Sequence, residues 1–142
     1  MKYLAYSLQS NSTLKFFTIK SSHIGHDAAK SISQLIKSNS TINTINLFFN
    51  TIECGVQSII KSLQFNSTLT SVDFFGNKIK NAEKPLKFES LHFNTSLAVL
   101  QLSHLNLNVE EVKSISESLY TNYTLRELSL PCNSIDNMGA AS

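Results

Sequence analysis

The chain has 142 residues, of which 42% are hydrophobic and 15% are charged, so it is long enough for one domain with a substantial core. Twelve basic residues against ten acidic residues give a net charge of only +2, and the basic residues are scattered along the sequence. This balance argues against a surface for nucleic acid or for an acidic membrane, because both require clustered basic side chains.

Residues 1–10 mix apolar and polar side chains and lack the continuous apolar region of a secretory signal. Their pattern matches the helical half of a repeat, with Leu4 and Leu8 at core positions. No apolar run elsewhere approaches the roughly 18 residues of a membrane span. The two cysteines, Cys54 and Cys132, show no metal-ligand spacing and cannot form a disulfide framework, so a reducing, cytoplasmic location is the expectation.

From residue 11 onward, a tetrapeptide of the form Asn-x-Thr/Ser-Leu/Ile recurs at nearly constant spacing. It begins at Asn11, Asn39, Asn66, Asn94 and Asn122, at intervals of 28, 27, 28 and 28 residues. A fixed period of this length indicates a repeat architecture. The predicted units are a half repeat at 1–10, repeats at 11–38, 39–65, 66–93 and 94–121, and a partial repeat at 122–142, together forming a single array.

Within each repeat, a strand pattern changes to a helix pattern. Apolar residues first alternate with polar ones, as at Ile45 and Leu47, which indicates a short strand with one buried face. Apolar residues then recur at helical spacing, as at Val56, Ile59 and Leu63. We expect the strands of successive repeats to pair in parallel, with a helix in each connection. Because a helix is about 10 Å wide and paired strands lie about 4.8 Å apart, such a stack should curve around its sheet.

The residues of each repeat follow the pattern LxxLxLxxNxI, most plainly over residues 125–135. This pattern resembles the leucine-rich repeats of the ribonuclease-inhibitor type, and the resemblance covers practically the whole chain. It implies an α/β solenoid, a segment of a horseshoe with a parallel concave sheet and helices on the convex side. Similar repeats occur in ribonuclease inhibitor, the GTPase activator of Ran, tropomodulin-like actin regulators and intracellular immune receptors, so the resemblance is specific for the fold and not for a partner.

Two departures from the pattern predict local irregularity. Leu105 stands where other repeats carry a small polar residue such as Asn50 or Asn77. In the third repeat, Pro85 and Lys87 interrupt the apolar spacing of the helix, and proline fits only in the first turn of a helix. We expect that helix to be short or irregular.

Three groups of residues suggest chemistry, and each has a simpler structural interpretation. The five Asn-x-Ser/Thr tripeptides are formal glycosylation acceptors, but they coincide with the corner of every repeat, where they can form turn hydrogen bonds. His23 and His26, beside Asp27, are interpreted as surface histidines of a loop. Cys54 and Cys132 are too far apart along the array for a disulfide, and no histidine is expected near either, so both are interpreted as free structural thiols.

No nucleotide-binding, zinc-protease or serine-hydrolase motif is present, so no catalytic residue, metal or cofactor is predicted. The favoured function is a non-catalytic module that binds a protein partner along the concave sheet, without nucleic acid or membrane. Because neither end carries a polar capping repeat, the chain is expected to be part of a longer signalling or scaffold protein or to self-associate end to end. The alternatives are a GTPase regulator similar to the Ran activator and a self-stacking structural element.

The outward positions of the predicted strands form the candidate binding surface. Phe48 and Phe75 are expected to be cross-strand neighbours that face solvent, with Lys20 and Asp73 beside them. An exposed aromatic pair rimmed by opposite charges is typical of a protein-binding hot spot. The alternative interpretation is that both phenylalanines belong to the core and that the strand phase is slipped by one residue. The predicted partner-binding residues are Thr18, Lys20, Asn46, Phe48, Asp73, Phe75, Gln101 and Ser103.

Overall fold

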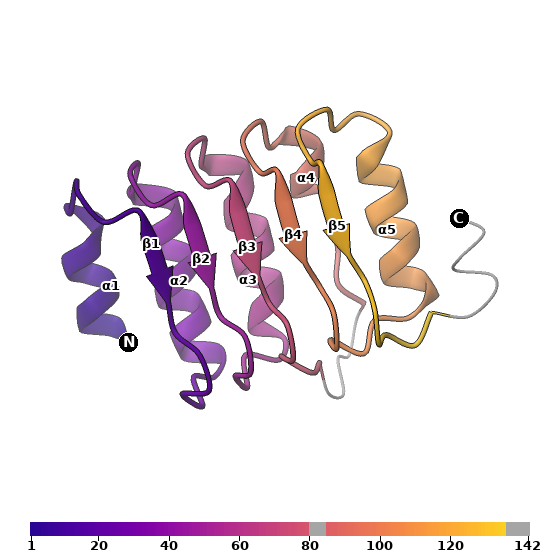
Figure 1. The fold of residues 1–142 in the computed structure, drawn as a ribbon, viewed down its shortest axis with the longest axis horizontal. Coiled ribbons are helices and arrows are strands. Elements are labelled where there is room, and N and C mark those ends of the chain that lie inside the picture. The colour runs from indigo at the N-terminus through magenta and orange to yellow at the C-terminus, as the bar shows by residue number, and fades with distance from the viewer. Residues whose placement is uncertain (80–84, 136–142) are drawn as a thin grey trace.

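The computed structural model describes residues 1–79 and 85–135, in which helices and strands alternate along the chain (Figure 1). The helices are α1 (Lys2–Gln9), α2 (His26–Ser38), α3 (Gly55–Ser62), the 3-10 turn η1 (Leu63–Phe65), α4 (Ser90–Phe93) and α5 (Val109–Leu119). The strands are β1 (Phe16–Thr18), β2 (Thr44–Asn46), β3 (Ser71–Asp73), β4 (Val99–Gln101) and β5 (Glu127–Ser129). Within these residues, no helix is long and apolar enough to cross a membrane.

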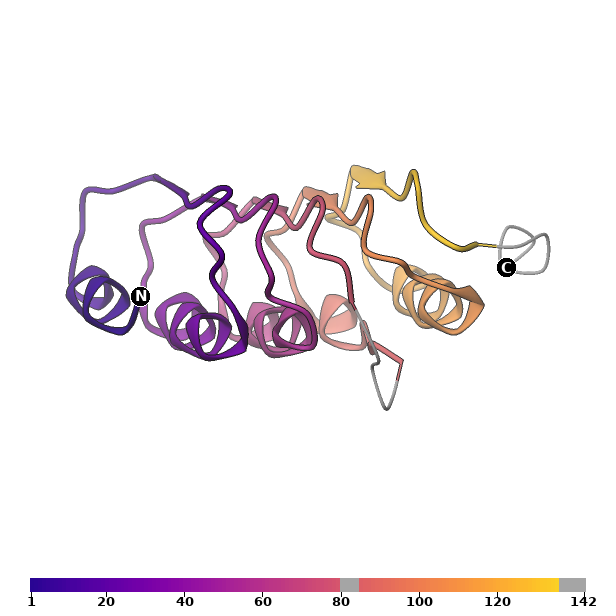
Figure 2. The same cartoon turned by 90° about the horizontal axis from the view of Figure 1, so that it is seen from below.

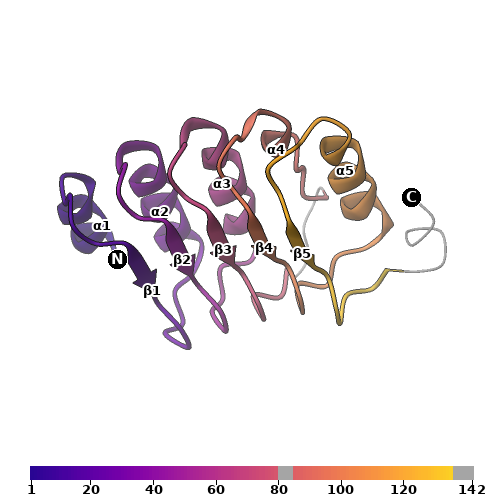
Figure 3. The same cartoon turned by 45° about the horizontal axis from the view of Figure 1, so that its top comes forward.

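All five strands belong to one parallel sheet in the order β1-β2-β3-β4-β5. The register pairs equivalent positions of successive repeats, as in Phe17 with Ile45 and Ile45 with Val72. The helices form a second layer on one face of this sheet (Figure 2, Figure 3). The opposite face is called the open face here, because no described helix covers it. The predicted α/β class and the parallel sheet are therefore confirmed.

The core lies between the sheet and the helices. Strand residues such as Ile45 and Val72 and helix residues such as Ile59 are at most 1% exposed. One repeat alone cannot bury these faces, so each repeat depends on its neighbours. Leu128 of β5, which has a strand neighbour on only one side among the described residues, is only half-buried.

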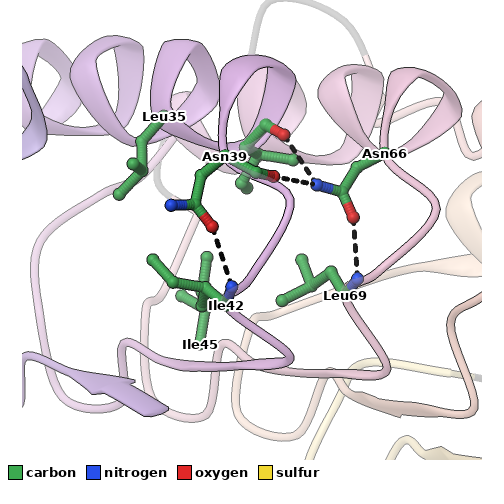
Figure 4. A pocket seen from close by; sticks show the side chains of 7 residues that line it. Leu35, Asn39, Ile42, Ile45, Asn66 and Leu69 are labelled. Carbon is green, nitrogen blue, oxygen red and sulfur yellow. Dashed lines mark hydrogen bonds between the residues drawn. The ribbon is translucent and has the colours of Figure 1, made fainter. Parts of the chain in front are cut away.

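The recurring asparagines join each repeat to the one before it (Figure 4). The side-chain amide of Asn66 donates to the carbonyl oxygens of Ile36 and Asn39, at 2.7 and 3.0 Å. Its carbonyl oxygen accepts from the backbone N–H groups of Thr68 and Leu69, at 2.9 and 2.7 Å. The amide nitrogen that a glycan would need is thus bonded inside the fold. The same four bonds recur around Asn39, Asn94 and Asn122.

A second row of asparagines supports the turns that follow the strands. The amide of Asn77 donates to the carbonyl oxygens of Leu47 and Phe74, at 2.8 and 3.0 Å, and Asn77 is fully buried. Leu105, which departs from this row, is fully buried as well, so the turn of that repeat has an apolar side chain in place of the amide. Buried backbone carbonyls require such partners, which explains why asparagine is the prevailing residue.

The predicted irregularity of the third repeat is confirmed, because α4 contains only four residues. Phe88 occupies the core beside it and is fully buried. Helix α5 supports this segment: Glu111 accepts a hydrogen bond from Leu86 N at 3.1 Å, and the Ser114 hydroxyl accepts one from Phe88 N at 2.9 Å. Glu111 also completes the capping box at the start of α5 with Asn108.

The prediction for the first helix is wrong at one position. Leu4 was placed in the core with Leu8, but Leu4 is 48% exposed and Ala5 is buried in its place. Ala5 and Leu8 are three residues apart and therefore lie on one face of α1, toward α2.

Candidate functional site

The strand register brings four of the predicted binding residues into one row across the open face. Thr18, Asn46, Asp73 and Gln101 are successive partners on β1 to β4. Two of them also shape the loops that follow their strands. Asn46 Oδ1 accepts a hydrogen bond from Phe48 N at 3.2 Å. In the next repeat, Asp73 Oδ1 accepts the equivalent bond from Phe75 N at 2.8 Å. The polar row therefore holds the backbone that carries the aromatic residues.

Phe48 and Phe75 are half-buried, and a third ring, Phe49, lies between them. The centroids of Phe48 and Phe49 are 5.6 Å apart, and those of Phe49 and Phe75 are 5.0 Å apart, both edge to face. At one end the His104 ring is 5.1 Å from Phe75, and at the other Lys20 Nζ is 5.6 Å from the Phe48 centroid. We call Phe48, Phe49 and Phe75 the aromatic platform. Edge-to-face pairs of this kind add about 0.5–1.5 kcal/mol beyond simple burial.

The alternative interpretation of a slipped strand phase is wrong. Leu47 and Phe74 are fully buried between sheet and helices, whereas Phe48 and Phe75, which follow them directly, are not. The alternation of the strands continues into the two residues that follow β2 and β3, so Leu47 and Phe74 lie in the core and the next residue of each lies at the surface.

Phe49 was missed in the sequence because it falls outside the alternating strand pattern. Its backbone has a φ of +53°, a left-handed conformation that is uncommon for residues other than glycine. The equivalent residue of the next repeat is Gly76, with a φ of +72°, and a Cβ on it would lie 2.6 Å from Phe49 Cδ1. The Phe49 ring thus fills the space of a side chain that Gly76 lacks. A phenylalanine followed one repeat later by a glycine was the signal available in the sequence.

The remaining predicted residues differ in accessibility. Thr18 and Lys20 are exposed, and Gln101 is half-buried with its amide donating to Glu127 Oε1 at 2.9 Å. Ser103 is only 3% exposed, so its prediction as a contact residue is wrong. Its short side chain lies against the next repeat, with its hydroxyl 3.1 Å from that of Ser129.

The interpretation of the thiols and histidines also needs correction. Cys54 and Cys132 are both free, as predicted, and both are exposed. His26 begins α2 and is not in a loop, and its Nδ1 lies 3.4 Å from Cys54 Sγ, so the expectation that no histidine approaches a cysteine is wrong. His23 is exposed. Among the described residues, no three metal-ligating side chains are grouped together.

No protein-family model matches the sequence, and a search of curated proteins found no match either. Among solved structures, the chain is similar to one described as "Leiomodin-1 Actin-Binding Site 2 (ABS2)", with a TM-score of 0.69 and 24% sequence identity. The match covers 85% of this chain and 73% of that chain. A likeness at this identity concerns the fold alone. It supports a fold of the leucine-rich-repeat type.

Proposed function

We propose that this chain is a non-catalytic protein-binding module that holds a partner on its open face, centred on the aromatic platform. The chain would be a single leucine-rich-repeat array of the ribonuclease-inhibitor-like type, curved as a horseshoe segment with the open face concave, and would act in the cytoplasm. The observation that carries this proposal is the row of three contacting phenylalanines at the surface, of which Phe49 is 54% exposed.

The platform has the features of a binding hot spot. Aromatic side chains supply a large apolar area with few rotatable bonds, so little conformational entropy is lost when a partner covers them. The hydrogen bonds from Phe48 N to Asn46 and from Phe75 N to Asp73 already order the loops. A partner's apolar side chain would pack against the ring of Phe49, while Lys20 would orient a polar or acidic neighbour.

Capture from a lysate of the source cell tests the proposal, with the 142-residue chain as bait. Phe49→Asn removes the exposed ring, and asparagine tolerates the left-handed backbone. Phe65→Asn is the matched control, because Phe65 is 61% exposed at the opposite, helix-terminal edge of the repeats. We expect a protein that is retained by wild type and by Phe65→Asn and is lost by Phe49→Asn.

Purified actin is the first single partner to test by co-sedimentation, since one solved structure similar to this chain is described as an actin-binding site. Binding that depends on Phe49 would identify the partner. Capture of the same proteins by all three forms of the bait would contradict a role for the platform.

A further inference from the structure

Cys54 and His26 form an exposed thiol–imidazole pair at the end of the helical layer, outside the aromatic platform. The Sγ atom of Cys54 is 3.4 Å from Nδ1 of His26, and both residues are exposed. We propose that Cys54 is a modification site that forms a mixed disulfide with low-molecular-weight disulfides, with His26 as the proton acceptor. This inference is independent of the proposed function.

Tight packing of two helices builds the pair. Cys54 is the N-cap residue of α3, and His26 is the first residue of α2. A Cβ on Gly55 would lie 2.5 Å from the Cβ of Ala29 and 3.3 Å from the Cα of His26. Only glycine therefore allows the start of α3 to approach α2 this closely. This backbone packing brings the thiol of Cys54 close to the imidazole of His26.

Among the described residues, the charged side chains nearest to His26 in sequence pair with each other and not with its imidazole. Asp27 pairs with Lys30 on the same helix at 3.7 Å, and both side chains are largely exposed. Cys132 is the second exposed thiol, and among the described residues its sulfur has no hydrogen-bond partner. Among the described residues, the chain thus contains one thiol within hydrogen-bond distance of an imidazole nitrogen and one without such a contact, which allows an internal comparison.

The reaction balances without any further reagent. With the ring proton of the neutral imidazole on Nε2, Nδ1 accepts the proton of the Cys54 thiol as Sγ attacks one sulfur of the incoming disulfide. The bond between the two reagent sulfurs breaks and the small thiolate departs, and the imidazolium passes its proton to that thiolate or, where the thiolate is a weak base, to water. One protein thiol and one small disulfide become a mixed disulfide and a small thiol, in which Cys54 sulfur is oxidised and the departing sulfur is reduced.

The test uses dithiobis(nitrobenzoate), a small aromatic disulfide that releases a coloured thiolate. The rate of Cys54 is followed in the Cys132→Ser chain, and that of Cys132 in the Cys54→Ser chain. We expect Cys54 to react about tenfold faster or more, a modest share of what a positioned base contributes in enzymes. His26→Asn and His26→Gln should each remove that advantage, whereas His23→Asn, which changes an exposed histidine three residues away, should not.

Circular dichroism establishes that each variant is folded, and the same histidine substitutions in the Cys54→Ser chain should leave the rate of Cys132 unchanged. Equal rates for Cys54 in the Cys132→Ser chain and Cys132 in the Cys54→Ser chain, with both histidines intact, would overturn the proposal. It would also be overturned by folded His26 variants in which Cys54 reacts as fast as before.

Discussion

Asn66 shows how a single side chain holds two repeats together. Its replacement by alanine leaves two carbonyl oxygens and two N–H groups at a half-buried corner without their partners. We expect Asn66→Ala to lower the free energy of unfolding by about 2–3 kcal/mol, since each unsatisfied buried group costs roughly 1–3 kcal/mol and water can reach part of this site. Chemical denaturation followed by circular dichroism measures the loss.

Asn11 provides the matched control for that experiment. Its side-chain oxygen accepts from the N–H groups of Thr13 and Leu14, but its amide makes no bond to a preceding repeat among the described residues. Asn11→Ala should therefore cost about 1 kcal/mol. An equal loss of unfolding free energy for Asn11→Ala and Asn66→Ala would show that the hydrogen bonds between repeats do not stabilise the fold.

Gly76 is required for two separate reasons, and a double-mutant cycle separates them. Its φ is +72°, and an added Cβ would meet the Phe49 ring at 2.6 Å. We expect Gly76→Ala to cost about 2 kcal/mol in the wild-type chain, of which about 1 kcal/mol comes from the left-handed backbone. In a Phe49→Asn background only the backbone cost should remain. An identical loss in both backgrounds would mean that the ring is not packed over this glycine.

At the scale of elements, the contact between α2 and α3 depends on Gly55. An added Cβ would overlap the Cβ of Ala29, and neither atom is the flexible end of a long side chain. Gly55→Ala should lower the free energy of unfolding by about 1–3 kcal/mol, as expected for overpacking. Gly25→Ala is the control, since a Cβ there would meet only the Thr51 carbonyl oxygen at 3.7 Å. Thermal unfolding of both variants measures the difference, and comparable losses would contradict the packing argument.

The elements differ in how far the sequence predicts them. The strands were predictable because the apolar positions repeat every 27 or 28 residues and the register of the sheet follows the same period. The short α4 was predictable from Pro85 and Lys87. The burial of Phe88 in the core beside the shortened helix was not predictable. It depends on a hydrogen bond from Phe88 N to Ser114 of α5, which belongs to the next repeat.

The candidate site was predictable only in part, for a related reason. The row that includes Asp73 and the outward direction of Phe48 and Phe75 follow from the alternation of strand residues. Phe49 lies beyond the strand, where a left-handed backbone turns its ring toward the next repeat. His26 and Cys54 are 28 residues apart, so the repeat period places them in neighbouring repeats, but the contact of their side chains depends on how closely α3 packs against α2, which the period does not give.

At the scale of the whole molecule, the parallel register aligns residues that are about 28 positions apart into rows on one open face. Phe48 and Phe75 come from different repeats, and each is half-buried. The rows bring them together with Phe49 and place His104 and Lys20 at the two ends. We therefore propose that recognition belongs to the assembled face and not to any single repeat.

Titration calorimetry with wild type, Phe49→Asn and Phe65→Asn measures whether the dissociation constant of the captured partner depends on the platform. We predict that Phe49→Asn weakens binding at least tenfold, or about 1.4 kcal/mol, because it removes the centre of the platform. Phe65→Asn should bind within about twofold of wild type, since scattered exposed aromatic residues contribute little outside a contact. An unchanged dissociation constant for folded Phe49→Asn, or an equal loss of affinity for Phe65→Asn, would show that the partner does not bind at the aromatic platform.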